Sequence, residues 1–324
     1  MTKYSILDLA HLGADERPAT AFARSLALAQ SAEKLGYYRI WYAEHHNMPS
    51  IASSAPAVLI SHIAAKTSHI RLGAGGVMLP NHAPLLIAEQ FGTLAELYPN
   101  RIDLGLGRAP GTDSKTLRAL RRDYESAERF PQDVKELQGY LGDQTLVPGI
   151  NAVPGRGSHV PLYILGSSLF GASLAGALGL PYAFASHFAP DLYQQAIKVY
   201  RDKFIPSAQC QEPYVIAAAN FIAADSKVEA EEQRKQMLGN RVRALVPHTQ
   251  KYSDREIDAF IKSGAADQIL NMFRITGAGT APEVSKYLQD FAALVAADEM
   301  MLVNASPTTE QASHGLKLLA GEIL

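Results

Sequence analysis

The feature that most constrains this chain is a repeat of strands and helices in its first third. Apolar segments typical of strands begin near residues 4, 39, 70 and 101, at intervals of 35, 31 and 31 residues. A segment with helical spacing of apolar residues follows each of the first three. The first such segment has Pro18 in its first turn and Gly36 just past its end, the residues favoured at those two positions. Strands that alternate with helices at this spacing predict βα units and a parallel sheet.

Four more strand candidates bring the pattern to eight. They cover residues 161–165, 182–185, 214–222 and 299–303. Eight alternating units predict a TIM-like (βα)8 barrel in the α/β class. Two stretches interrupt the rhythm, at about 109–160 after the fourth strand and about 240–279 before the last. We interpret them as insertions, which in a barrel tend to be lids or partner surfaces.

The length of 324 residues fits either one domain or two. A plain barrel needs roughly 250 residues, and the two insertions account for the surplus. We therefore expect a single domain over residues 1–324.

Composition excludes several classes of protein. Hydrophobic residues make up 47% of the chain and charged residues 19%, an ordinary globular balance. The net charge of −2 argues against a dedicated nucleic-acid partner. No apolar run reaches the ~20 residues of a membrane span, and the N-terminus lacks the pattern of a signal peptide. The single cysteine, Cys210, rules out an intrachain disulfide, and we assign it no catalytic role. We expect a cytoplasmic protein.

The sharpest candidate site is the run Glu44, His45 and His46 after the second predicted strand, because barrel sites lie at the carboxyl ends of strands. A histidine of ordinary pKa can act as acid or base near neutral pH. Neighbouring strand side chains point to opposite faces, so the two histidines should not share a metal, and no further carboxylate pattern accompanies them. We therefore predict no metal. Hydrogen bonding at the barrel rim is the alternative role for both histidines.

Two other strand ends carry candidate binding residues. Gly75-Gly76 in the third strand indicates a bulge or the close approach of a ligand, or else a simple bend. Arg108 after the fourth strand and the turn Gly166-Ser167-Ser168 after the fifth indicate an anion site. Arginine donates paired hydrogen bonds, and a helix start exposes free N–H groups. The same turn can also simply cap a helix.

Gly105-Leu-Gly107 does not begin a dinucleotide-binding fingerprint. The third glycine of that motif is missing, since residue 110 is proline. The sequence therefore argues against a Rossmann-type site.

Four segments, taken in order, are distinctive. They are Trp41-Tyr-Ala-Glu-His-His46, Leu72-Gly-Ala-Gly-Gly-Val-Met-Leu-Pro80, Arg101-Ile-Asp-Leu-Gly-Leu-Gly-Arg108 and Gly166-Ser-Ser168. With them the chain resembles the bacterial luciferase-like, flavin-dependent monooxygenases, from Tyr4 to about Val303. It is most similar to a single-chain branch with Arg-Ala-Pro-Gly-Thr-Asp after the fourth strand, whose physiological substrates are mostly unassigned.

The resemblance implies a barrel with insertions, often dimeric, that uses reduced FMN and O2 to oxygenate a small organic substrate. A separate NAD(P)H-flavin reductase usually supplies the reduced FMN, so we expect a two-component monooxygenase and a homodimer. Three other functions stay open. They are a deazaflavin-dependent oxidoreductase, a non-catalytic flavin-binding protein and a metal-dependent barrel hydrolase that uses His45 or His46.

The resemblance also implies roles for individual residues. His45 matches the active-site histidine beside the flavin ring, and Glu44 matches its acidic neighbour. Gly75 and Gly76, next to Ala74, match a pair joined by a non-prolyl cis peptide that presses on the isoalloxazine. Arg108 and the turn Gly166-Ser167-Ser168 match the residues that contact the phosphate. We expect His46, His82 and His187 in the substrate pocket, and the 240–279 insertion lies where luciferase carries its mobile lid.

Overall fold

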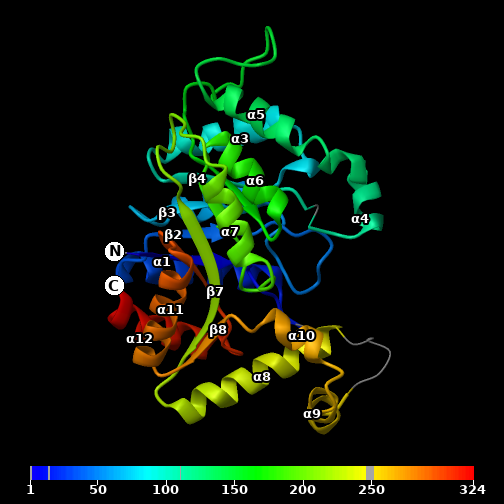
Figure 1. The fold of residues 1–324 in the computed structure, drawn as a ribbon, viewed down its shortest axis with the longest axis vertical. Helices are drawn as coiled ribbons and strands as arrows, with labels where there is room; N and C mark the ends of the chain where they lie inside the picture. The colour runs from blue at the N-terminus through cyan, green and yellow to red at the C-terminus, as the bar shows by residue number, and fades with distance from the viewer. Residues whose placement is uncertain (1, 14, 110, 246–251) are drawn as a thin grey trace.

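The fold is a closed parallel barrel surrounded by helices, as the strand rhythm predicts (Figure 1). A computed structural model describes residues 2–13, 15–109, 111–245 and 252–324. Strands β1 to β7 pair in sequence order, and β9 pairs with both β7 and β1, which closes the barrel. The strands are β1 Lys3–Asp8, β2 Arg39–Tyr42, β3 Arg71–Met78, β4 Ile102–Gly107, β5 Leu162–Gly166, β6 Tyr182–Phe184, β7 Val215–Ala223, β8 Thr276–Gly279 and β9 Glu299–Asn304.

The strand β8 lies outside the barrel, and the expectation of eight strands missed it. The strand β6 has only three residues and pairs with Val215–Ala217, the first part of β7. The same edge of β7 is therefore free further along, and β8 pairs there with Asn220–Ala223. Two of the four residues of β8 are glycines, which gives it little strand signal.

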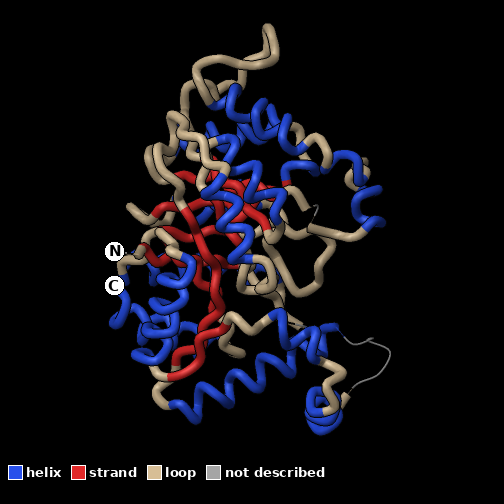
Figure 2. The backbone as a smooth tube through the Cα atoms, viewed as in Figure 1, coloured by secondary structure: helices blue, strands red, loops and turns tan. Residues whose placement is uncertain are grey.

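Helices follow the strands and cover the outside of the barrel, which appears as the red strands inside blue helices in Figure 2. The helix α1 shows why they form where they do. Pro18 occupies its first turn, and Gly36 ends it with a φ of +90°. The helices are α1 Pro18–Leu35, α2 Pro56–Ala64, η1 Leu79–Asn81, α3 Pro84–Leu97, α4 Ser114–Ala119, η2 Tyr124–Ala127, α5 Phe130–Leu141, α6 Leu169–Leu178, α7 Tyr193–Asp202, α8 Lys227–Leu245, α9 Asp254–Lys262, α10 Asp267–Met272, α11 Ala281–Val295 and α12 Thr309–Ile323. Among the helices of the described residues, none is long and apolar enough to cross a membrane.

The two irregular stretches of the sequence contain short helices. The first, about 109–160, forms α4, η2 and α5, and the second, about 240–279, includes the end of α8, the helices α9 and α10, and β8. In Figure 1 they lie toward opposite ends of the long axis of the molecule. Residue 110, in the Arg-Ala-Pro-Gly-Thr-Asp motif, and residues 246–251 lie outside the described residues.

A network of buried charges fills the end of the barrel where the strands begin. Arg39 opens β2 and pairs with Asp103 at 2.8 Å and with Glu299, the first residue of β9, at 2.9 Å. Arg71 pairs with the other oxygen of Asp103. Tyr214 donates a hydrogen bond to Glu299 at 2.8 Å. Because this network occupies the amino ends of the strands, the opposite end is the one available for a site.

A second interior layer lies above these charges and is built around Trp41. Its ring packs edge-on against that of Tyr163, with centroids 5.0 Å apart. Glycine at position 75 makes room for the indole, since a Cβ there would lie only 2.8 Å from the Cβ of Trp41. The interior is therefore packed, as in other barrels of this size.

Candidate functional site

The loop after β2 carries the run of Glu44, His45 and His46 at the carboxyl end of the barrel. Two hydrogen bonds hold it. The hydroxyl of Ser53 donates to the carbonyl of Ala43 at 2.5 Å, and the backbone N–H of His45 donates to the carbonyl of Ser53 at 3.0 Å. The run is therefore anchored on the residues that precede α2.

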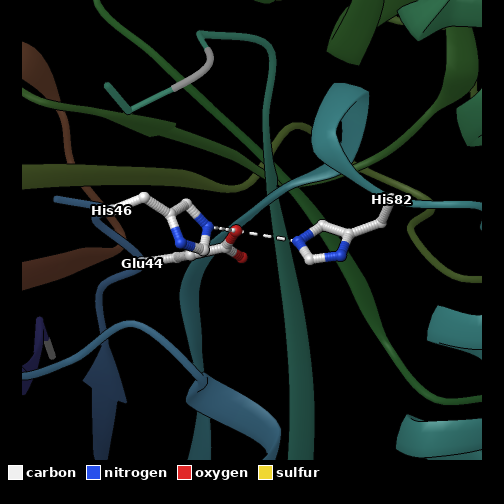
Figure 3. A group of neighbouring side chains, drawn as sticks. All are labelled: Glu44, His46 and His82. Atoms are coloured by element: carbon white, nitrogen blue, oxygen red, sulfur yellow. Dashed lines mark hydrogen bonds and ion pairs between the residues drawn. The ribbon is translucent and has the colours of Figure 1, made fainter. Parts of the chain in front are cut away.

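The carboxylate of Glu44 joins two of the predicted pocket histidines (Figure 3). Its Oε1 accepts hydrogen bonds from the Nε2 atoms of His46 and His82, each at 2.7 Å. Its Oε2 accepts from the backbone N–H of Met78 at 3.2 Å. The side chain of Glu44 is only 1% exposed, against 18% for His46 and 30% for His82. The structure thus brings together three residues that the sequence separates into two strand ends.

Electrostatics favour an ionised Glu44 in this cluster. Burial alone would raise the pKa of Glu44, but the hydrogen bonds from His46 and His82 outweigh it and lower the pKa below its usual value. The hydrogen bond to Glu44 raises the pKa of His46. Both shifts favour the ionised carboxylate of Glu44 and the protonated ring of His46.

The same three residues offer a donor set that sequence reasoning missed. One carboxylate oxygen and two imidazole nitrogens lie within 4.8 Å of one another, which is the ligand type that suits transition metals. The prediction of no metal considered only the adjacent histidines and further carboxylates near them, and it overlooked His82, which lies 38 residues from Glu44 along the chain. In the structure both Nε2 atoms are hydrogen-bonded to Glu44.

The pair of Glu44 and His46 predicts a pH dependence of stability. The raised pKa of His46 gives stabilisation that is complete below its unfolded value of 6.5 and is lost as the pH rises through the folded value. The lowered pKa of Glu44 gives stabilisation that is present above 4.5 and is lost as the pH falls. We expect His46→Gln to reduce the free energy of unfolding more at about pH 5.5 than at about pH 8 in urea titrations. An equal loss at both pH values would contradict this assignment.

The ring of His45 has different surroundings from that of His46. Its Nδ1 is buried and has no hydrogen-bond partner among the described residues. Burial lowers the pKa of His45, which keeps the imidazole neutral near pH 7. His11, after β1, bridges to Ile51 in the loop that also accepts the backbone hydrogen bond of His45. The rings of the two adjacent histidines therefore have different neighbours at the barrel mouth.

Arg108 and the serine turn meet at the ends of β4 and β5. The guanidinium of Arg108 lies 4.2 Å from the ring centre of Phe170, in the first turn of α6. Ser168 is the N-cap of this helix, and its side chain makes no capping hydrogen bond. Within the described chain no carboxylate pairs with Arg108. A cation thus stands beside a helix start with free N–H groups, which is a suitable cradle for a phosphate.

Gly75 and Gly76 interrupt the pairing of β3 with β4. The register shifts between Ala74 and Val77, and the peptide bond between the two glycines is cis, as the resemblance implies. A Cβ on Gly76 would lie 2.8 Å from the carbonyl oxygen of Gly105, so only glycine fits there without a shift of the backbone. The contact of these residues with a flavin ring stays a prediction.

His187 lies apart from the Glu44 cluster, after β6. Asn220 of β7 donates a hydrogen bond from its side chain to the carbonyl of His187 at 2.6 Å. Burial and the nearby charge of Arg241 lower the pKa of His187 to about 4. Sequence reasoning did not single out Arg241 or His11. Arg241 belongs to a helix rich in charges, where no periodic pattern distinguishes it from solvent-exposed neighbours.

Comparison with known proteins identifies the family. The family model described as luciferase-like monooxygenase matches residues 2–298. The chain belongs to this family. Among its relatives is a luciferase-like monooxygenase of Escherichia coli (strain K12), 55% identical over 70% of this chain and 68% of that protein. The N-acetyl-S-alkylcysteine monooxygenase of Bacillus subtilis (strain 168) is 36% identical over 72% of this chain and 71% of that protein.

Solved structures of the luciferase-like fold agree with the barrel. The structure of apo-MsnO8 is 30% identical, with a TM-score of 0.88 over 99% of this chain and 98% of that chain. Two more distant structures share the fold alone. The oxygenating constituent of 3,6-diketocamphane monooxygenase of Pseudomonas putida, in complex with FMN, is 14% identical, with a TM-score of 0.74 over 99% of this chain and 97% of that chain. An F420-dependent secondary alcohol dehydrogenase is 17% identical, with a TM-score of 0.68 over 100% of this chain and 99% of that chain.

Proposed function

We propose that this chain is a reduced-FMN-dependent monooxygenase that oxygenates a small organic substrate. The observation that carries the proposal is the pairing of an anion cradle, at Arg108 and the start of α6, with a histidine-rich rim at the same end of the barrel. The family and its monooxygenase relatives support the reaction class. A more distant barrel in complex with FMN supports the choice of flavin.

The residues of the cradle fit the phosphate of FMN. Arg108 would supply the charge, and the N–H groups and hydroxyls of Ser167 and Ser168, which follow Gly166, would supply further donors. The segment Ala74, Gly75 and Gly76 would lie against the ring system, with Glu44 beside it.

The protein would bind, orient and shield rather than supply the redox chemistry. Reduced FMN, when bound, supplies the electrons for the reaction, in which one oxygen atom of O2 enters the substrate and the other becomes water. His45, neutral near pH 7, would donate or accept a proton at the ring nitrogens close to that reaction. The Glu44, His46 and His82 cluster and His187 would line the substrate pocket. The 240–279 insertion would exclude water as a lid.

A flavin transfer experiment tests the proposal. FMN is photoreduced without oxygen, mixed with the protein, and then exposed to O2 while its absorbance is followed by stopped flow. We expect the protein to change the rate of reoxidation relative to free reduced FMN. Reoxidation at the free rate at saturating protein would overturn the proposal.

The phosphate cradle makes a separate prediction. Replacing Arg108 with Met should weaken the binding of reduced FMN by about tenfold or more, because a charge-assisted hydrogen bond is lost. Riboflavin lacks the phosphate, so its affinity should change little in the same variant. Equilibrium titrations under anaerobic conditions measure both. An equal loss for the two flavins would place Arg108 away from the phosphate.

The F420-dependent barrel favours one alternative, a deazaflavin-dependent oxidoreductase that moves hydride without O2. Parallel titrations with reduced FMN and reduced F420 separate the two functions by affinity. Retention of oxidised flavin, together with no effect on the reoxidation of reduced FMN, would instead indicate a non-catalytic flavin-binding protein.

We further propose a single cytoplasmic domain that forms a homodimer, receives reduced FMN from an NAD(P)H-flavin reductase and needs no metal.

A further inference from the structure

The rings of His46 and His82 point at one oxygen of Glu44 from two separate loops (Figure 3). Each Nε2 lies 2.7 Å from Oε1 of Glu44, and one ligand atom from each residue lies within 4.8 Å of the other two. Within residues 2–13, 15–109, 111–245 and 252–324, no other group of three His, Cys, Asp or Glu side chains has this spacing. Two imidazoles and one carboxylate form a common ligand set for divalent transition metals.

The spacing of these three groups suits a cation after small movements. Zinc binds imidazole nitrogen and carboxylate oxygen at about 2.0–2.2 Å, so two ligand atoms of a tetrahedral site lie about 3.3 Å apart. The two oxygen-to-nitrogen distances of 2.7 Å would therefore lengthen by roughly 0.6 Å, which small rotations of the side chains provide. His46 and His82 are 18% and 30% exposed, so a cation can reach them from the solvent.

The hydrogen bonds to Glu44 do not prevent a cation from binding. An ionised carboxylate only accepts, so each ring carries its proton on Nε2 while the two hydrogen bonds last. A neutral ring frees Nε2 when its proton moves to Nδ1, and a protonated ring frees it by releasing a proton to water. The carboxylate of Glu44, only 1% exposed, then faces a divalent cation in place of two N–H groups. This exchange brings a larger positive charge to a buried anion.

Backbone contacts hold the three ligands in position. The N–H of Met78 donates to Oε2 of Glu44 at 3.2 Å, which orients the carboxylate and leaves Oε1 toward the rings. The hydroxyl of Thr112 donates to the carbonyl of His46 at 3.1 Å. The N–H of His82 donates back into η1 at 2.9 Å. Contacts of this kind around the ligands favour metal binding, because little order has to be gained when the ion arrives.

We propose that Glu44, His46 and His82 bind one divalent transition-metal cation, for which Zn²⁺ is the probe. The cation joins the loop after β2 to η1 after β3 and leaves a fourth position open to water. The proposed flavin reaction does not require this ion, which would occupy the rim of the proposed substrate pocket. The binding itself does not rest on the proposed function.

The test titrates Zn²⁺ alone into the full chain, freed of metal by a chelator and without flavin, in a calorimeter. We expect one tightly bound Zn²⁺ per chain in the wild type. His46→Gln and His82→Gln should each bind it at least about tenfold more weakly. Glutamine keeps a donor for Glu44 but is not among the usual zinc ligands, so these variants should fold. Zn²⁺ should also raise the thermal unfolding midpoint of the wild type more than that of either variant.

His314→Ala is the matched control. His314 pairs with Asp225 at 2.9 Å on the surface, and among the described residues this pair has no third ligand. The control should keep the tight site of the wild type. In the wild type, Zn²⁺ should shift the imaging-independent 15N signals of the His46 and His82 rings, which the two Gln variants assign.

Three results would overturn the inference. They are no tight site in the wild type, equal affinity in the wild type and both Gln variants, and a loss in His314→Ala as large as in those variants. Since no flavin is present, the zinc result stands apart from the outcome of the reoxidation experiment.

Discussion

Replacing Asp103 with Asn is expected to lower the free energy of unfolding by about 3–5 kcal/mol. Asp103 is fully buried and accepts from Arg39 at 2.8 Å and from Arg71. Asn has nearly the same shape, so packing is retained while the negative charge is lost. Among the described residues, Arg39 then keeps Glu299 as its one carboxylate partner.

Asp103→Asn is expected to destabilise the fold because of the positive charge on the buried Arg39. Burial opposes its positive charge, but Asp103 and Glu299 outweigh burial and hold its pKa above the ordinary value. Removing the charge of Asp103 leaves Arg39 with one carboxylate, Glu299, and leaves Arg71 without the carboxylate it pairs with. Arg39 is only 1% exposed, so water does not compensate its charge. The penalty is that of an uncompensated buried charge, which exceeds the net worth of the original pair.

Urea unfolding at neutral pH measures the effect. The matched control is Lys286→Ala, which breaks an exposed ion pair with Asp290 on α11 and should change stability by less than about 0.5 kcal/mol. A change in Asp103→Asn as small as that of the control would show that the interior charges do not stabilise the barrel end.

The barrel itself is largely predictable from the sequence. Each strand is a short apolar run bounded by a helix start or a turn, and prolines such as Pro18, Pro56 and Pro84 mark the first turns of α1, α2 and α3. These local signals are strong because propensity and burial agree there. The strand β8 has no such signal. It forms because β6 is too short to cover the edge of β7, which is a property of the assembled sheet.

The site is predictable residue by residue but not as a set of contacts. Glu44, His46 and His82 each stand at a strand end, which the barrel rule selects. Their hydrogen bonds depend on the path of η1 after β3, which no local pattern specifies. Arg241 was missed for a related reason. Its contact with Phe273 forms only once α8 and the segment before β8 are packed together.

His45→Ala is expected to alter the reoxidation of bound reduced FMN by roughly 100-fold, the lower end of what a positioned acid or base contributes. His45 stands at the carboxyl end of β2 with its Nδ1 buried and unpartnered among the described residues. It is held in place by its backbone hydrogen bond to Ser53 rather than by its ring. The ring is therefore free to bond to a reacting group, in contrast to that of His46, which Glu44 already engages.

Stopped-flow absorbance of the same photoreduced samples measures this change, alongside the affinity for reduced FMN. The affinity should change by less than about threefold, because the cradle at Arg108 is intact and carries the charge-assisted contacts. His69→Ala is the matched control, since His69 is 75% exposed beside Glu33 and away from the strand ends at the mouth. A His45→Ala trace that superimposes on the wild type would remove His45 from the chemistry. A loss of affinity as large as the kinetic change would instead make His45 a binding residue, because the two quantities separate positioning of the flavin from proton transfer beside it.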